Sequence, residues 1–129
     1  MRRETITLTT QSGPQAISAE IAVTGPEQEQ GLMFRSRMGD DQGMLFVYPK
    51  PQLITMWMRN TYISLDMVFI GADGRIGRVE ENTEPLSERV IASGELAQSV
   101  LELKAGTARR LGLMRGDKVT APSLKTSGP

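Results

Sequence analysis

The sequence predicts a mostly β domain with a minor α component: a single compact β-barrel or sandwich, dominated by antiparallel pairing, with about eight short strands and two short helices. Two observations carry this prediction. Short segments of alternating or continuous apolar residues recur along the chain, and 13 Gly and 7 Pro indicate frequent turns. The 129 residues are a usual length for one domain. We expect residues 1–121 to form it and the polar residues 122–129 to be a disordered tail.

The strands are predicted from apolar alternation or from short apolar runs between turn residues. They are expected at 5–9, 17–23, 44–48, 53–61, 63–70, 76–81, 100–103 and after the turn at 116–117. The first two are expected to pair as a hairpin, and so are the strands on either side of 72–75. Pro49 and Pro51 are expected to end the third strand.

The two helices are predicted from their end signals. Thr24 and Glu27 have the spacing of a capping box, and Pro26 is tolerated in a first helical turn, so a helix is expected to run to about Arg35. Residues 105–111 are expected to form one or two helical turns that Gly112 stops.

Composition excludes several classes of function. Lys plus Arg and Asp plus Glu both total 15, which disfavours nucleic-acid binding. No apolar run reaches the ~20 residues that span a membrane, and the start of the chain lacks the apolar block of a signal peptide. The sequence has no Cys and no His, so thiolate nucleophiles, His general bases and the common metal sites are excluded, and no cofactor is expected.

A set of motifs in a fixed order resembles a widespread prokaryotic family known as domain of unknown function 192. The motifs are Gly31–Arg35, Gly43–Phe46, Met56–Thr61, Leu65–Asp66, Asp73–Gly74, Val100–Leu103, Ala105–Gly106 and Gly116–Asp117. The resemblance covers roughly residues 16 to 121, with the Trp-Met-Arg-Asn-Thr block most specific. It implies a small β-rich domain, exported in many members, so a periplasmic or exported location is favoured although this chain shows no signal peptide.

The resemblance carries no established activity and no catalytic residues. The chain departs from the family pattern where Gln28 stands for Arg, Ser64 for Pro and Gly71 for an acid. A small molecule or an envelope component is the expected partner, and nothing indicates an oligomeric state.

The stretch from Met56 to Asp66 is the most plausible place for a site. Strand parity sets Met56, Met58 and Asn60 on one face and Trp57 and Arg59 on the other. Trp57 beside Arg59 is either an exposed recognition pair or a buried core residue. We expect a non-enzymatic binding or accessory domain whose candidate ligand-binding residues are Trp57, Asn60, Asp66, Arg35, Arg59 and Glu102.

Two alternatives remain open. Asp66 and Glu102 lie between apolar neighbours, where a carboxyl group must be paired or must serve a site, so they are candidates for a glycosidase-like hydrolase. Asp66 bonded to Asn60 or to backbone is the structural interpretation. Met33, Met56 and Met58 are candidates for a copper(I) site, against the simpler interpretation that thioethers fill an irregular core.

Overall fold

In the computed structural model, which describes residues 2–124, seven strands form one curled sheet in the order β5-β4-β6-β3-β2-β1-β7. The strands are β1 Arg3–Thr10, β2 Gly13–Ala22, β3 Gln42–Met56, β4 Leu65–Ile70, β5 Ile76–Glu80, β6 Ile91–Lys104 and β7 Lys118–Thr120. All pairs are antiparallel except β2 with β3, which is parallel. The helices are α1 Gly25–Gln30 and α2 Thr107–Leu111. The predicted mostly β fold with two short helices is confirmed.

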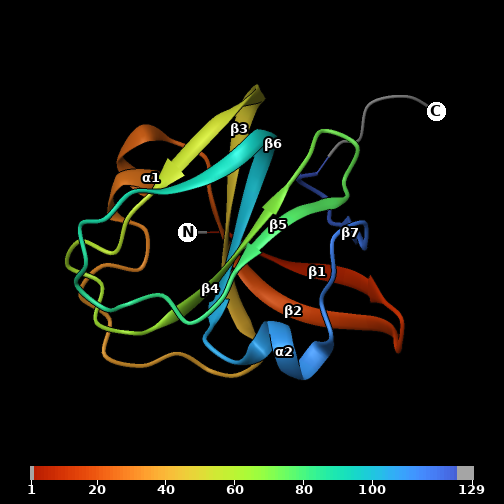
Figure 1. Ribbon diagram of the computed structural model, residues 1–129, viewed down its shortest axis with the longest axis horizontal. Helices are drawn as coiled ribbons and strands as arrows, with labels where there is room; N and C mark the ends of the chain where they lie inside the picture. Colours follow the sequence, from red (N-terminus) through yellow and green to blue (C-terminus); the bar gives the residue numbers. More distant parts are fainter. Residues whose placement is uncertain (1, 125–129) are drawn as a thin grey trace.

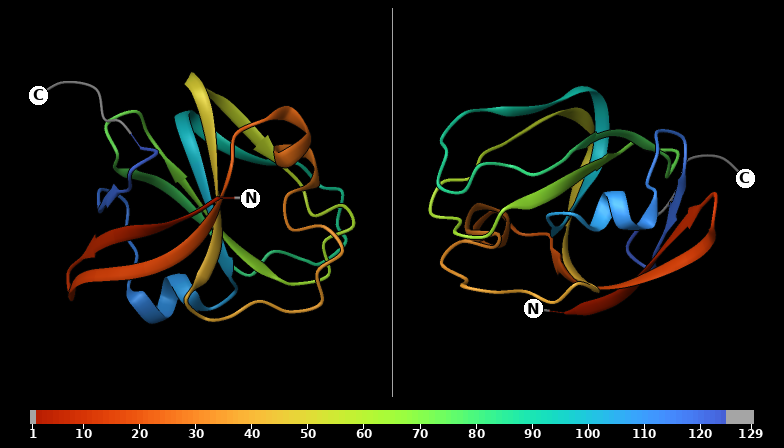
Figure 2. Two further views of the ribbon diagram at one scale, coloured as in Figure 1. Left: turned by 180° about the vertical axis from the view of Figure 1, so that it is seen from behind. Right: turned by 60° about the horizontal axis from the view of Figure 1, so that its bottom comes forward.

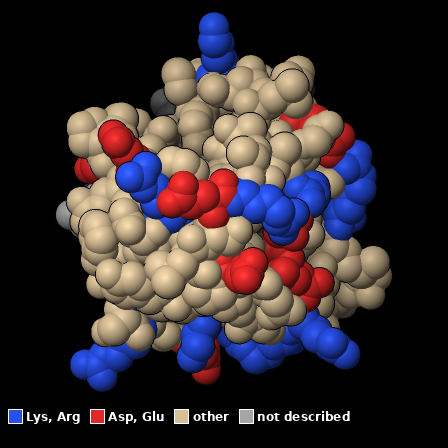
Figure 3. All heavy atoms as spheres, turned by 60° about the vertical axis from the view of Figure 1, so that its left-hand side comes forward, with Lys and Arg blue, Asp and Glu red and all other residues tan. Residues whose placement is uncertain are grey.

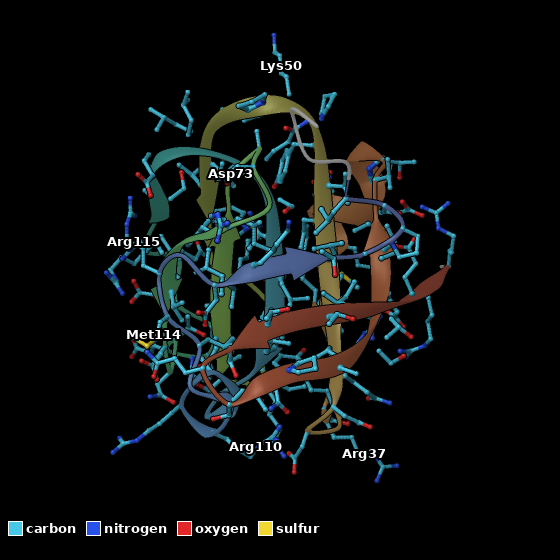
Figure 4. The ribbon with its side chains drawn as sticks, turned by 90° about the vertical axis from the view of Figure 1, so that its right-hand side faces the viewer. Arg37, Lys50, Asp73, Arg110, Met114 and Arg115 are labelled. Carbon is cyan, nitrogen blue, oxygen red and sulfur yellow. The ribbon has the colours of Figure 1, made fainter. Side chains whose placement is uncertain are left out.

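The sheet curls into a half-barrel whose two edges meet. The Ile76 N–H donates to the Asp117 carbonyl over 2.9 Å, and the Val119 N–H donates to the Gly74 carbonyl over 2.7 Å. These bonds join the start of β5 to β7, so the outer strands of the sheet lie side by side at this point (Figure 1). Figure 4 views the molecule from the side of β7, the blue arrow, with Lys50 at one end of the molecule and Arg37 and Arg110 at the other.

Two apolar cores lie on opposite faces of the central strands β3, β4 and β6. One fills the inside of the half-barrel and includes Leu45, Val68 and Leu101. The other, with Met44, Phe46 and Met67, is covered by α1 and by the long connections on one side of the molecule. Figures 1 and 2 show these connections gathered on the side away from the β1–β2 hairpin. Every residue of β4 is therefore buried.

The chain forms seven strands and not about eight because β3 continues through Pro49 and Pro51. The pairing of β3 with β6 is interrupted between Val47 and Gln52, so the missing proline N–H groups fall where the ladder is already broken. The strand ends at Met56, and residues 59–60 form a turn. The parity predicted for 57–61 was wrong for that reason.

The capping box of α1 is confirmed, since the Glu27 N–H donates to Thr24 Oγ1 and the Thr24 N–H donates to Glu27 Oε1. The helix ends at Gln30 and not at Arg35, because Gly31 adopts a positive φ of 48° that turns the chain. Helix α2 ends at Gly112 as predicted.

The segment that was expected to be a tail begins inside the described part of the chain. Residues 121–124 form a turn in which the Leu124 N–H donates to the Ala121 carbonyl, and the Ser123 N–H donates to Glu4. Residues 125–129 lie outside the described residues. Within residues 2–124, no helix has both the length and the apolar character needed to span a membrane.

Candidate functional site

Glu102 is a buried carboxyl group near the middle of the sheet. Its cross-strand neighbours are Met44 on β3 and Met67 on β4, both fully buried, and its own exposed fraction is 4%. Burial raises the pKa of Glu102 to about 8, because the thioether and alkyl groups around it do not solvate a charge. No hydrogen bond from another residue of the described chain opposes this shift. At neutral pH the group is therefore mostly a protonated acid.

Glu102 lines a cavity of about 250 Å³ on the loop-covered face. Three segments supply its other walls: α1 with the turn that follows it (28–33), the second half of β3 (Tyr48, Thr55, Met56), and the loop after β3 (Trp57, Arg59, Thr61). Helix α1 ends at Gln30 and β3 ends at Met56, and the segments that follow these two elements line the cavity.

The walls near Glu102 combine aromatic, thioether and polar groups. The Tyr48 hydroxyl donates to Met56 Sδ over 3.8 Å. Burial first, and then the negative charge that Glu102 can carry, raise the pKa of Tyr48. The Arg59 guanidinium lies 5.3 Å from the centroid of the Trp57 ring, a cation–π arrangement that holds the indole at the rim. Trp57 is part exposed, which answers the question that the sequence left open.

The turn at Asn60 anchors two exposed apolar residues beside the cavity. The Phe34 N–H donates to the Asn60 carbonyl over 2.8 Å, and the Leu86 N–H donates to the Thr61 carbonyl over 3.0 Å. Phe34 and Leu86 both have positive φ, 68° and 67°, which is costly for bulky side chains. The Phe34 ring also meets Tyr62 edge-on, with centroids 6.3 Å apart. Strained, exposed apolar residues are typical of binding surfaces.

A second hollow of about 490 Å³ adjoins the cavity and shares its Trp57–Arg59 wall. Phe34, Met33 and Asn60 complete this hollow together with α1. Figure 3 shows this side of the molecule, where uncharged atoms cover much of the surface and acidic and basic groups lie next to one another.

Asp66 has a different role. Its Oδ1 accepts from the Asn82 N–H, and its Oδ2 accepts from the Gly106 and Ala108 N–H groups, over 2.9–3.0 Å. Asp66 pairs with Leu103 and not with Glu102, so its side chain lies on the opposite face of the sheet. The structural interpretation, a bond to backbone, is the one found, and the pair required by the hydrolase alternative is not brought together.

The candidate residues from the sequence thus divide into two groups. Trp57, Arg59 and Glu102 line one cavity, and Asn60 lines the hollow beside it. Arg35 lies outside both and forms a 2.6 Å ion pair with Glu20. Sequence reasoning missed Tyr48. Residues 44, 46 and 48 alternate along the strand, which sets the Tyr48 side chain on the same face as Met44 and Phe46. Only the pairing of β3 with β6 shows that this face also carries Glu102.

The three methionines proposed for copper(I) do not share one site. Met33 and Met56 line the cavity, but Met58 is buried and its Sδ accepts from the Thr83 hydroxyl over 3.2 Å. Among residues 2–124 no cluster of three or more Asp or Glu could hold a metal ion.

Comparison with known proteins gives one family and several solved structures, two of which are described here. The crystal structure of a "putative transcription regulator" from Sinorhizobium meliloti is 44% identical, with a TM-score of 0.92 over 95% of this chain and 96% of that one. A protein of unknown function from Novosphingobium aromaticivorans is 41% identical, with a TM-score of 0.88 over 90% and 83%. No curated protein matches the chain. The family model of DUF192, described as an uncharacterized ACR, matches residues 6–121, and the chain therefore belongs to the DUF192 family.

Proposed function

We propose that this protein is a non-enzymatic binding or accessory domain that holds a small ligand in the cavity over Glu102. One observation carries the proposal: a buried carboxyl group with a pKa of about 8 and no hydrogen-bond partner among the described residues lines that cavity. Buried polar groups are almost always paired in folded proteins, so a carboxyl left unpaired beside a cavity indicates a ligand that pairs with it.

The state of Glu102 indicates the class of ligand. A protonated carboxyl donates a hydrogen bond, so an uncharged ligand with an acceptor oxygen suits the floor of the cavity. Trp57 at the rim offers a flat apolar surface for the rest of the ligand. A small molecule, or an uncharged group that projects from an envelope component, has this chemistry.

The test is a thermal-shift screen with uncharged oxygen-bearing compounds: monosaccharides, lactones and aromatic amides. A compound present at about 100 times its Kd should stabilise the protein by roughly 2.7 kcal/mol. We expect this shift to disappear in Trp57→Ala and to weaken in Glu102→Gln. Leu96→Ala is the control, because Leu96 is also an exposed apolar residue and does not line this cavity. A shift that survives Trp57→Ala would place the ligand elsewhere.

The description of the Sinorhizobium relative raises nucleic-acid binding as a different function. In this chain basic and acidic residues balance, and Arg3, Arg35, Arg78 and Arg115 each pair with a glutamate. These pairs compete with phosphate contacts, which supports the choice of a small ligand over DNA. Fluorescence anisotropy of labelled duplex DNA at low salt would reverse that choice if it showed saturable binding.

A further inference from the structure

A second cavity lies at the open end of the half-barrel, on the face of β6 opposite to Glu102. Ser99 pairs with Val47 on β3 and with Ile70 on β4, and both neighbours belong to or pack on the barrel core. Ser99 and Glu102 are three residues apart on one strand, so their side chains point to opposite faces. This cavity is therefore separate from the proposed ligand site.

The Ser99 hydroxyl has no hydrogen-bond partner. Ser99 is 1% exposed, and its Oγ is the one side-chain nitrogen or oxygen within residues 2–124 that has neither solvent-accessible surface nor a hydrogen-bond partner. An unpaired buried hydroxyl destabilises a fold and calls for an explanation such as a bound molecule. Ser99 lines a cavity of about 170 Å³. The Oγ itself is shielded from that space, so a molecule in the cavity would pair with the hydroxyl after rotation of the Ser99 side chain.

The rest of the cavity is mostly apolar and its shape is fixed by two segments. Val47, Ala72 and Leu124 supply apolar walls, and the β4–β5 turn at Gly71–Gly74 forms one side. The other polar side chains of the lining, Gln98 and Ser123, are already hydrogen-bonded, to the Tyr48 carbonyl and to Glu4. Leu124 packs on the barrel core. The segment before it is anchored to β1, because the Ser123 N–H donates to Glu4 Oε1 over 2.9 Å.

We propose that this cavity binds a small, mostly apolar molecule that carries a single hydrogen-bonding group for the Ser99 hydroxyl. The volume suits one aromatic ring, since an engineered apolar cavity of about 150 Å³ binds benzene. Phenol has the required shape and chemistry: its ring fills the apolar part and its hydroxyl pairs with Ser99. Benzene has the same ring without the pairing group.

The experiment is a titration of the full chain with phenol and with benzene, followed by amide chemical shifts in ¹H–¹⁵N spectra. We expect saturable changes at residues 71–74, 99 and 124 in the native protein. Ser99→Ala should weaken phenol at least fivefold and leave benzene within twofold. Ser99→Val, which removes the hydroxyl and adds about one methyl group to the cavity wall, should weaken the binding of both compounds. Removal of an unpaired hydroxyl should raise Tm, so both variants are expected to fold.

Three outcomes would overturn the proposal. No saturable change with either compound would mean that the cavity holds water only. Phenol binding that is unchanged in Ser99→Ala would mean that the hydroxyl does not pair with the ligand. Benzene binding that is unchanged in Ser99→Val would place the ligand elsewhere. Trp57→Ala should leave phenol binding unchanged, so this proposal and the one for the Glu102 cavity fail independently.

Discussion

Asp66 and Glu102 are two buried carboxyl groups on neighbouring strands in opposite circumstances. Asp66 on β4 lies opposite Leu103 of β6, and Glu102 lies opposite Met67, so an offset of one residue sends the two side chains to different faces of the sheet. Asp66 accepts three backbone N–H bonds. Glu102 accepts none from the described residues and lines a cavity.

This difference shows that a buried Asp or Glu is not, by its burial alone, evidence for a functional site. The carboxylate of Asp66 holds the start of α2 and the loop at Asn82 against the end of the sheet, which is a structural task. The carboxyl of Glu102 holds nothing in place and lowers stability at neutral pH. A residue retained in spite of that cost is the better candidate for function.

The largest expected effect that tests this contrast comes from Asp66→Asn. The substituted amide keeps one acceptor oxygen but sets an NH₂ group against backbone N–H donors. We expect a loss of about 3 kcal/mol or more of unfolding free energy, a large part of the total for a domain of this size. Urea unfolding followed by Trp57 fluorescence measures it. A loss below about 1 kcal/mol would remove the structural role assigned to Asp66.

Glu102→Gln should raise the unfolding free energy, and the size of this increase should depend on pH. The pKa of Glu102 is about 8 in the folded protein and near 4.5 when exposed, so between these values only the folded state keeps the proton. Rising pH then favours the unfolded state by up to about 1.4 kcal/mol per pH unit. This contribution to stability is complete below pH 4.5 and lost above pH 8.

Gln at position 102 does not titrate, so the variant should lack the part of the pH dependence of unfolding free energy that Glu102 contributes. Urea unfolding of both proteins should be measured from pH 5 to pH 9. We expect the unfolding free energy of the variant, relative to that of the native protein, to increase with pH up to about pH 8 and to stay constant above it. All other titrating groups are common to both proteins and cancel in the difference. Parallel profiles over the whole range would mean that Glu102 is ionised in the folded state and would remove the basis for an uncharged ligand.

The sequence predicted most local structure, because its signals act over a few residues. The Thr24–Glu27 cap, the Gly112 stop and the two hairpins depend on neighbours in the chain and were predicted correctly. Pro49 and Pro51 misled because their effect depends on where β3 pairs with β6. A proline ends a strand only where the ladder requires its N–H.

The residues that line the Glu102 cavity were predicted in part for the same reason. Trp57 and Arg59 are two residues apart in sequence, so their association at the rim was within reach of local reasoning. Asp66 and Glu102 were indistinguishable in sequence, since each is an acid between apolar residues. Only the register of β4 on β6 shows which face each side chain takes, and register is a long-range property.

The smallest expected effect tests whether the loop-covered face contains a second destabilising residue besides Glu102, namely Leu86 with its positive φ. Leu86 is 56% exposed and has a φ of 67°, a conformation that Asn tolerates better, as Asn60 and Asn82 do at 54°. Leu86→Asn should therefore raise unfolding free energy by about 0.5–1 kcal/mol.

Leu96→Asn is the matched control. Leu96 is also exposed, but it lies in strand β6, where Asn is disfavoured, so this variant should lose stability by up to about 1 kcal/mol. A gain in stability for Leu86→Asn together with a loss for Leu96→Asn would show that Leu86 lowers the stability of the fold, as we propose for Glu102. A loss at both positions would mean that the Leu86 side chain makes stabilising contacts where it lies, and the backbone strain at Leu86 would then not indicate a binding surface.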